Sequence, residues 1–212
     1  MSPLLQKASA YYLSKPRKYK YKDVWVWVEP TVFPPFLTIS TKILLEFSET
    51  LSLKGKTFLE LGCGCGILSI CSAKNGALVT ATDINTMALQ ALTKNASRNE
   101  VALEIIESDL FDELQTKTFH FIFINPPYYP KEPKSVAEKA WFCGESFEYF
   151  EKLFLQLPKF SNLDNKIYMI LSEDCQLQKI KAIALKNAMA FELVFEKKVL
   201  GEANFLYQLK KL

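Results

Sequence analysis

The chain has 212 residues, of which 49% are hydrophobic, and its 26 Lys and Arg outnumber its 23 Asp and Glu by three. This length supports one well-buried core and is too short for two ample ones. No apolar run is long enough to span a bilayer and no secretory signal is recognisable, so we expect a cytoplasmic domain without a membrane partner. The small net charge excludes a basic field over the whole protein, but it leaves local contact with nucleic acid open.

Residues 1–36 are predicted to form a basic and aromatic arm followed by a strand. Residues 11–22 read YYLSKPRKYKYK, in which cations alternate with tyrosines. Cations beside aromatic rings suit a phosphate backbone and stacked bases, but short basic arms are usually solvated and partly mobile, and we favour the second interpretation. The segment VWVWV, Val24–Val28, is predicted to be a strand that packs its indoles in the core or at a dimer contact rather than against bases. A helix is expected at about 38–47.

A glycine-rich turn follows the first central strand. Residues 57–70 read TFLELGCGCGILSI, an apolar strand that runs into alternating glycines and then an apolar helix. Glycines let a ligand approach the backbone at a helix N-terminus, so Gly62, Gly64 and Gly66 are predicted to bind a nucleotide-like cofactor. Their GxGxG spacing differs from the GxGxxG of pyrophosphate binding. Glu60 would repel a pyrophosphate, but it suits a cationic sulfonium or ammonium group.

Acidic residues end or follow the next two predicted strands. Asp83 follows the strand at 78–82, where a carboxylate can accept hydrogen bonds from both ribose hydroxyls. A helix N-cap is the alternative role for Asp83, because an apolar helical pattern begins near Thr86. Asp109 follows a strand at 103–106 and is predicted to accept a hydrogen bond from an adenine amino group, although an Asp in such a place is usually a turn residue.

The segment FHFIFINPPY, residues 119–128, is an apolar strand that ends in an Asn-Pro-Pro-Tyr turn. This turn indicates chemistry on a planar nitrogen, such as an amide or an exocyclic base amine. The Asn125 side-chain oxygen and the Pro126 carbonyl can accept its N–H bonds and stabilise the positive charge that grows as the nitrogen attacks. Pro127 stiffens the turn, and Tyr128 would lie against the flat face of the substrate. The alternative is a plain loop after a buried strand.

The cysteines and the single histidine are not predicted to carry chemistry. Five cysteines without a secretory signal indicate reduced thiols rather than a disulfide framework. Cys63 and Cys65 do not have the CxxC spacing of zinc motifs, so no metal site is predicted. His120 begins the strand before the Asn-Pro-Pro-Tyr turn and has no obvious partner, which favours a structural role.

Strands and helices alternate along the chain, which predicts an α/β fold with a mostly parallel, twisted, Rossmann-like sheet and helices on both faces. The last two strands flank the turn LGEA and are typical of a β-hairpin. Strands are expected at 57–61, 78–82, 103–107, 119–124, 166–171, 191–199 and 204–209. Helices are expected at 67–74, 86–98, 146–157 and 175–188.

With these motifs in this order, the chain resembles a class I S-adenosylmethionine-dependent methyltransferase from about residue 42 to its C-terminus. It is most similar to HemK-like glutamine N5-methyltransferases and to related small-domain methyltransferases that act on nucleic-acid bases. The resemblance implies S-adenosylmethionine as cofactor, a catalytic domain over residues 37–212, and a seven-stranded sheet closed by an antiparallel hairpin.

The same resemblance assigns roles within the catalytic domain. It implies that the NPPY turn holds the acceptor amide, that Asn125 also lies against the cofactor, and that the aromatic segment 33–36 covers the cofactor pocket. The segment AWFCGE, residues 140–145, resembles the eukaryotic-type HemK branch, but Cys143 stands where that family often has glycine.

Three functions from different classes stay open. The one we favour is methylation of a glutamine side-chain amide in a protein such as a translation release factor. The second is methylation of an exocyclic amine of an RNA or DNA base. The third is a cofactor-binding partner subunit without turnover, and the intact NPPY turn weighs against it. The helical recognition domain of bacterial glutamine methyltransferases is expected to be missing or reduced, so a small activating subunit or a homodimer stays an open prediction.

Overall fold

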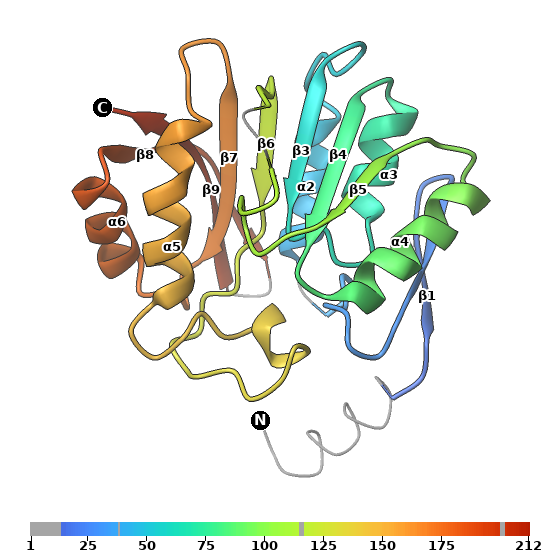
Figure 1. Cartoon of the computed structure of the whole chain (residues 1–212), viewed down its shortest axis with the longest axis horizontal. Coiled ribbons are helices and arrows are strands. Elements are labelled where there is room, and N and C mark those ends of the chain that lie inside the picture. Colours follow the sequence, from blue (N-terminus) through green and yellow to red (C-terminus); the bar gives the residue numbers. More distant parts are fainter. Residues whose placement is uncertain (1–13, 38, 115–116, 200–201) are drawn as a thin grey trace.

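The computed structural model describes residues 14–37, 39–114, 117–199 and 202–212, and over these residues it contains a seven-stranded sheet (Figure 1). Its strands are β3 (Thr57–Leu61), β4 (Leu78–Asp83), β5 (Glu104–Glu107), β6 (Phe121–Ile124), β7 (Lys166–Ser172), β8 (Met189–Val199) and β9 (Glu202–Lys211). Their order in the sheet is β5-β4-β3-β6-β7-β9-β8. Strands β3 to β7 pair in parallel, whereas β9 is antiparallel to both β7 and β8. The predicted α/β fold with a closing antiparallel hairpin is therefore confirmed.

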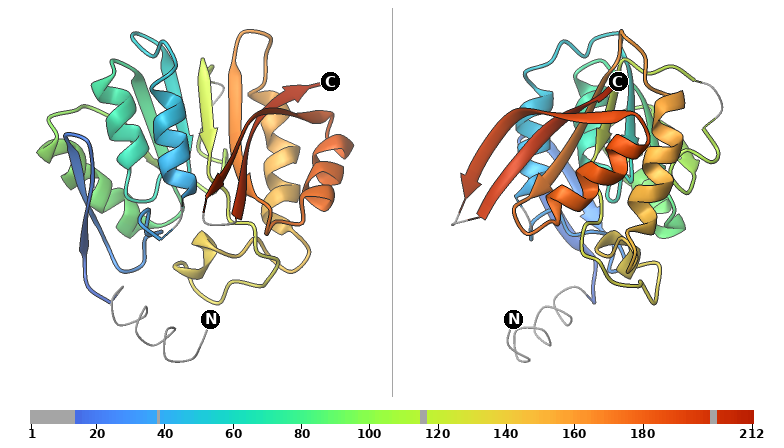
Figure 2. Two further views of the ribbon diagram at one scale, coloured as in Figure 1. Left: turned by 180° about the vertical axis from the view of Figure 1, so that it is seen from behind. Right: turned by 90° about the vertical axis from the view of Figure 1, so that its left-hand side faces the viewer.

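Helices cover both faces of this sheet. On one face lie α2 (Ser40–Ser48), α3 (Ile67–Lys74) and α4 (Thr86–Arg98), and on the other lie α5 (Glu148–Gln156) and α6 (Leu177–Lys186). Figure 1 shows the face with α5, and the left view of Figure 2 shows α2 and α3 from behind. Short 3₁₀ turns occur at η1 (Glu138–Ala140) and η2 (Leu157–Lys159).

The central strands are apolar because both of their faces are buried. In β3, Phe58 packs among the side chains of the α2–α3–α4 face, and the next residue, Leu59, packs on the α5–α6 face. Successive side chains of a strand point to opposite faces of the sheet. Because helices cover both faces, both sets of side chains are apolar, and the strand is a continuous hydrophobic run. From residue 57 onward every predicted strand and helix is present, with ends that differ by two residues or fewer.

The strands β1 (Arg17–Tyr21) and β2 (Val24–Val28) form an antiparallel hairpin outside the large sheet. The prediction of a mobile arm is therefore wrong for residues 17–21, while residues 11–13 lie outside the described residues. Tyr19 and Tyr21 explain the difference, because both rings pack against the buried side chains of the α2–α3–α4 face.

The valines of β2, and not its tryptophans, enter the core. Val24, Val26 and Val28 are buried in the cluster that α3 and α4 also supply. Trp25 and Trp27 alternate with them, so they lie on the opposite face and are only half-buried. Of the two packings predicted for the indoles, the core is wrong for this reason, and the dimer contact stays a prediction. The predicted division of the chain at residue 37 stays a prediction.

Two asparagines of α4 bind the outer edge of β2 as a partner strand would. Asn95 accepts the Trp27 N–H at 2.9 Å and donates to the Trp27 carbonyl at 2.9 Å. One turn later, Asn99 accepts the Trp25 N–H at 3.4 Å and donates to the Trp25 carbonyl at 2.8 Å. Side chains four residues apart share one face of a helix, so both amides reach the same strand and fasten the hairpin to α4.

None of the helices in the described part of the chain has the length and apolar character that crossing a bilayer requires.

Candidate active site

A cavity of about 360 Å³ lies beside the loops that leave β3, β4 and β6. Strand order reverses here, because β4 and β5 lie on one side of β3 whereas β6 and β7 lie on the other. At such a switch point the loops diverge and open a crevice at the carboxyl ends of the strands, and its volume suits a small-molecule ligand. Nine predicted site residues line it: Glu60, Gly62, Gly64, Asp83, Asp109, Asn125, Pro126, Pro127 and Tyr128.

The glycines of the turn after β3 have different surroundings. Gly62 has a φ of +78°, and a Cβ added there would meet nothing within 4 Å, so the backbone faces open space in the cavity. Gly66 also has a positive φ, but it does not line the cavity, and an added Cβ would overlap the side chain of Leu92 on α4. Gly62 thus fits a predicted ligand contact, while Gly66 lets α3 begin close to α4.

Glu60 joins the wall of the cavity to the first turns of α3. One of its carboxylate oxygens accepts the Ser69 N–H at 2.8 Å and also the Ser69 hydroxyl. Burial raises the pKa of Glu60 to about 8, and the Asp83 carboxylate adds to the rise, whereas the bonds from Ser69 oppose it. Near neutral pH the carboxyl therefore keeps a proton unless a cation lies beside it. This environment fits the cationic ligand group predicted for this position.

The two carboxylate oxygens of Asp83 hold the neighbouring turns. One accepts the Gly64 N–H at 2.8 Å and the other accepts the Asn85 N–H at 2.9 Å. Burial raises the pKa of Asp83, and these bonds oppose the rise. The N-cap of α4 is Asn85, whose side chain accepts the Met87 N–H, so the N-cap role considered for Asp83 is wrong. A carboxylate has about four acceptor positions, which leaves room for bonds to a ligand.

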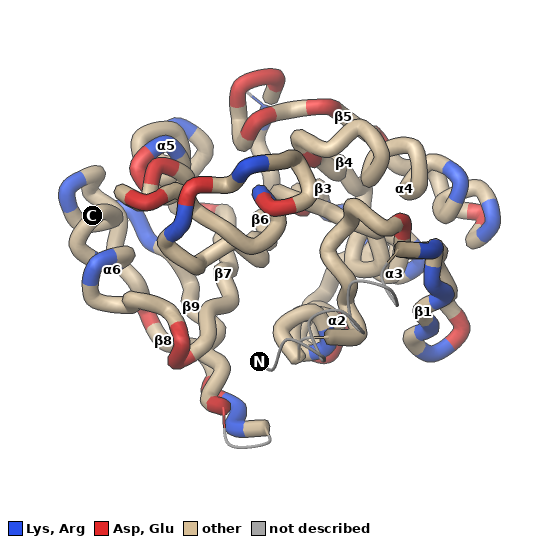
Figure 3. The backbone as a smooth tube through the Cα atoms, turned by 90° about the horizontal axis from the view of Figure 1, so that it is seen from below, with Lys and Arg blue, Asp and Glu red and all other residues tan. Residues whose placement is uncertain are grey.

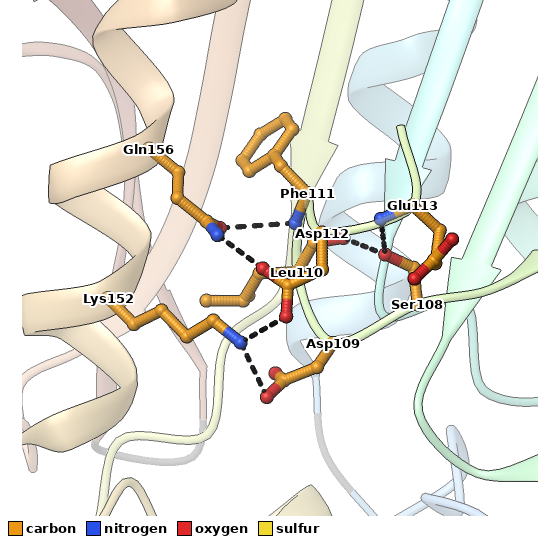
Figure 4. A network of polar contacts seen from close by, with 8 residues as sticks. All are labelled: Ser108, Asp109, Leu110, Phe111, Asp112, Glu113, Lys152 and Gln156. Carbon is orange, nitrogen blue, oxygen red and sulfur yellow. Dashed lines mark hydrogen bonds and ion pairs between the residues drawn. The ribbon is translucent and has the colours of Figure 1, made fainter. Parts of the chain in front are cut away.

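Asp109 lies at the edge of the cavity in a polar network that ties the loop after β5 to α5 (Figure 4). Lys152 binds Asp109 at 2.7 Å and Asp112 at 2.6 Å. Gln156 donates to Asp112 at 2.6 Å and accepts the Phe111 N–H at 3.2 Å. The ion pair fixes the loop, and the adenine contact of Asp109 stays a prediction.

The turn after β6 presents an oriented side-chain amide. Asn125 donates from Nδ2 to the hydroxyl of Ser40, at the start of α2, over 3.3 Å. With Nδ2 engaged, Oδ1 is the part of the amide that can accept a hydrogen bond from a ligand. Pro126 is buried, and Tyr128 is half-buried with its ring 4.8 Å from that of Tyr129. Burial raises the pKa of Tyr128 and a hydrogen bond with Ser172 opposes the rise, so the phenol keeps its proton.

Two segments far apart in sequence meet over the cavity. Phe33 precedes α2, and its ring lies 4.9 Å from the ring of Trp141 in the loop that follows the NPPY turn. Both residues line the cavity, and so does Pro35, so part of the segment 33–36 lies where the resemblance implied. Sequence reasoning gave no role to Trp141, Ser40 or Lys152, because no local spacing links them to the motifs.

The cysteines of the glycine-rich turn and His120 lie in environments typical of residues with a structural role. Cys63 and Cys65 are buried, and burial raises the pKa of both thiols. Among the described residues, no group of three His, Cys, Asp or Glu could hold a metal ion. His120 accepts the Thr57 N–H at Nδ1 over 3.1 Å and thereby joins the starts of β3 and β6, a contact that fits the structural role predicted for it.

The strand order and the cavity at the switch point agree with a class I S-adenosylmethionine-dependent methyltransferase, and the family comparison shows that the chain is one. More particularly, the model of the methyltransferase small domain family matches residues 23–143, and the chain belongs to this family. Its cofactor is S-adenosylmethionine. Three groups of the cavity fit this cofactor: the open backbone at Gly62, the buried carboxyl of Glu60, which a cation would stabilise in its charged form, and the acceptor oxygens of Asp83.

Relatives of known name differ in their acceptors. A protein N5-glutamine methyltransferase, so named provisionally, from Methanocaldococcus jannaschii is 28% identical over 176 residues, which cover 78% of this chain and 87% of the relative. Ribosomal RNA small subunit methyltransferase C from Haemophilus influenzae is 30% identical over 178 residues. That match covers 78% of this chain and 52% of the relative, so the chain spans about half of its length.

A solved structure with a similar fold is that of the Mtq2–Trm112 complex of E. cuniculi, described as responsible for methylating the translation termination factor eRF1. It matches with a TM-score of 0.65 and 18% identity, covering 86% of this chain and 99% of the other. This likeness concerns the fold.

Proposed function

We propose that this methyltransferase acts on a planar nitrogen held by the side-chain oxygen of Asn125 and the carbonyl oxygen of Pro126. The observation that carries the proposal is the hydrogen bond from Asn125 Nδ2 to Ser40. This bond holds the amide in one orientation and occupies its donor side, so the acceptor Oδ1 is left for a ligand in the cavity that Asn125 lines. An accepting oxygen beside the cofactor cavity suits a nitrogen that carries N–H bonds. S-adenosylmethionine supplies an electrophilic methyl group when it is bound.

In this mechanism the protein positions the nitrogen and stabilises charge. Two acceptor oxygens fix the direction of both N–H bonds, which aligns the nitrogen for attack. As the nitrogen gains positive charge, the same oxygens stabilise it more strongly than they stabilise the neutral ground state. The surplus proton leaves to water after transfer, so no general base is needed. Tyr128 keeps its phenolic proton, and its ring packs against the planar acceptor.

The acceptor that we favour is a glutamine side-chain amide of a protein, such as a translation release factor. The Methanocaldococcus jannaschii relative, which is named for N5-glutamine methylation, supports this choice, and it shares most of its length with this chain. By analogy with the two-protein complex of similar fold, a small activating subunit is a candidate partner. An exocyclic base amine is the second candidate, supported by the ribosomal RNA relative.

The test is methyl transfer from S-adenosylmethionine labelled with tritium in its methyl group. A release-factor protein, single-stranded RNA and DNA are supplied separately as acceptors, each with and without a candidate activating subunit. We expect label in the protein and in a glutamine-containing fragment after proteolysis. Label in nucleic acid alone would show that the acceptor is a nucleic-acid base and not a glutamine. Absence of label in every acceptor, while the cofactor still binds, would overturn transfer to a planar nitrogen in macromolecules.

A further inference from the structure

The outward face of the β1–β2 hairpin carries cations and indoles that the proposed active site does not use. The register pairs Lys18 with Trp27 and Lys20 with Trp25. Directly paired residues project from the same face of a sheet, so these four side chains lie together on the face opposite the buried valines. Both lysines are exposed and both tryptophans are half-buried.

The cations lie close to the aromatic rings. Lys18 Nζ is 4.1 Å from the centre of the Trp25 ring, and Arg98 of α4 places its guanidinium carbon 5.9 Å from the same ring. The Trp25 and Trp27 rings are 6.4 Å apart and nearly perpendicular. Figure 3 shows the lysines and arginines of β1 and those near the end of α4 on the same side of the molecule.

The backbone beneath the indoles is fixed. Asn95 and Asn99 bind the N–H and carbonyl groups of Trp27 and Trp25, so the main chain that carries both rings is held on α4. A ligand that stacks on these rings therefore meets a preorganised surface, and less entropy is lost on binding than with a flexible loop.

We infer that this face of the hairpin binds a single-stranded nucleic acid. Exposed ammonium and guanidinium groups attract the phosphate backbone, while unpaired bases stack on aromatic side chains. Double-stranded nucleic acid keeps its bases within the duplex and would use only the cations. An acidic protein would likewise pair with the cations and leave two adjacent indoles without a matching group.

The hairpin lies near the cofactor cavity. Trp27 precedes Thr31 by four residues, so the chain keeps their Cα atoms within roughly 14 Å. Thr31 lines the cavity, and its carbonyl accepts a hydrogen bond from Asn85 Nδ2 at 3.0 Å. A single-stranded nucleic acid bound on the hairpin therefore lies close to the cavity. The inference goes beyond the proposed transfer, because binding here does not require the nucleic acid to be the methyl acceptor.

The experiment is a fluorescence anisotropy titration of the full chain with a fluorescein-labelled single-stranded RNA over a series of salt concentrations. We expect Lys18→Ala combined with Lys20→Ala to reduce the slope of log K against log salt by about 1.4, since each phosphate contact to a single strand contributes about 0.7. Trp27→Ala should weaken binding about 5- to 150-fold, the range for loss of one stacked base. Trp27→Phe should retain most of the affinity.

Lys181→Ala is the matched control. Lys181 Nζ lies 4.6 Å from the Tyr207 ring, the same kind of pair, but it belongs to α6 at the other end of the sheet from β1 (Figure 1). This variant should bind RNA like the unchanged protein. All variants should retain their circular dichroism and their affinity for S-adenosylmethionine, which separates a lost surface from a lost fold.

Three results would overturn the inference: no RNA binding by the unchanged protein, equal loss in the Lys181 control, or equal affinity for poly-glutamate, which would assign the face to an acidic protein. Failure of the methyl-transfer assay, with RNA binding still lost only in the hairpin variants, would overturn the proposed function and leave this inference standing.

Discussion

The affinity for S-adenosylmethionine should rise with pH below neutrality, because Glu60 loses a proton when a cation binds beside it. Burial raises the pKa of Glu60 to about 8, compared with an ordinary value of about 4.3. At pH 7 roughly nine-tenths of the cofactor-free protein then carries a protonated Glu60. A nearby cation favours the charged carboxylate, so binding releases up to one proton. The dissociation constant should therefore fall by up to about tenfold per pH unit, or about 1.4 kcal/mol, as the pH rises toward the pKa.

Isothermal titration calorimetry in buffers of different ionisation enthalpy measures both the affinity and the number of protons released. The pH range should end at about 7.5, because the α-amino group of the cofactor titrates above that pH. Glu60→Gln is the matched variant, since its amide oxygen can still accept the Ser69 N–H but cannot titrate. We expect it to bind more weakly near neutral pH and to show a flat profile. A flat profile in the unchanged protein, or equal slopes in both, would refute the reasoning.

Other substitutions separate chemistry, cofactor binding and folding. Asn125→Ala should lower kcat by about 100-fold with little change in cofactor affinity, because it removes an acceptor aligned with the reacting nitrogen; unchanged turnover would make Asn125 a turn residue only. Asp83→Ala should weaken cofactor binding by about 1.5–3 kcal/mol in calorimetry through loss of charge-assisted bonds to ribose. Equal affinity would remove Asp83 from the site. Gly66→Ala should lower the free energy of unfolding in urea by about 2 kcal/mol or more, because φ is positive and the new Cβ would overlap buried Leu92. An unchanged urea midpoint would contradict that packing role.

The large sheet was predictable because its signals are local. The glycines after β3, Asp83 at the end of β4 and the NPPY turn after β6 each terminate an apolar run, and parallel strands bring such ends to one edge. The cofactor cavity therefore contains residues identified from the sequence, with Gly66 as the exception because its neighbour Leu92 lies on another helix.

The contacts that escaped prediction join distant residues without a local pattern. Strand β1 has charged residues at its outward positions and two tyrosines that point inward. Such a sequence is typical of a solvated arm, and only the structure shows the core against which the tyrosine rings pack. Trp141 meets Phe33 over the cavity, and Lys152 pairs with Asp109 from the middle of α5. Sequence periodicity shows which face of an element is buried, but not which element covers it.

The asparagine amides of α4 also affect how copies of the protein meet. A strand with an open row of N–H and C=O groups is a template on which another chain can add, and this leads to edge-to-edge aggregation. Asn95 and Asn99 occupy those groups at Trp27 and Trp25, so the outer margin of β2 offers little to an incoming strand. The same pair of side chains that fastens the hairpin thus protects the molecule from self-association through that margin.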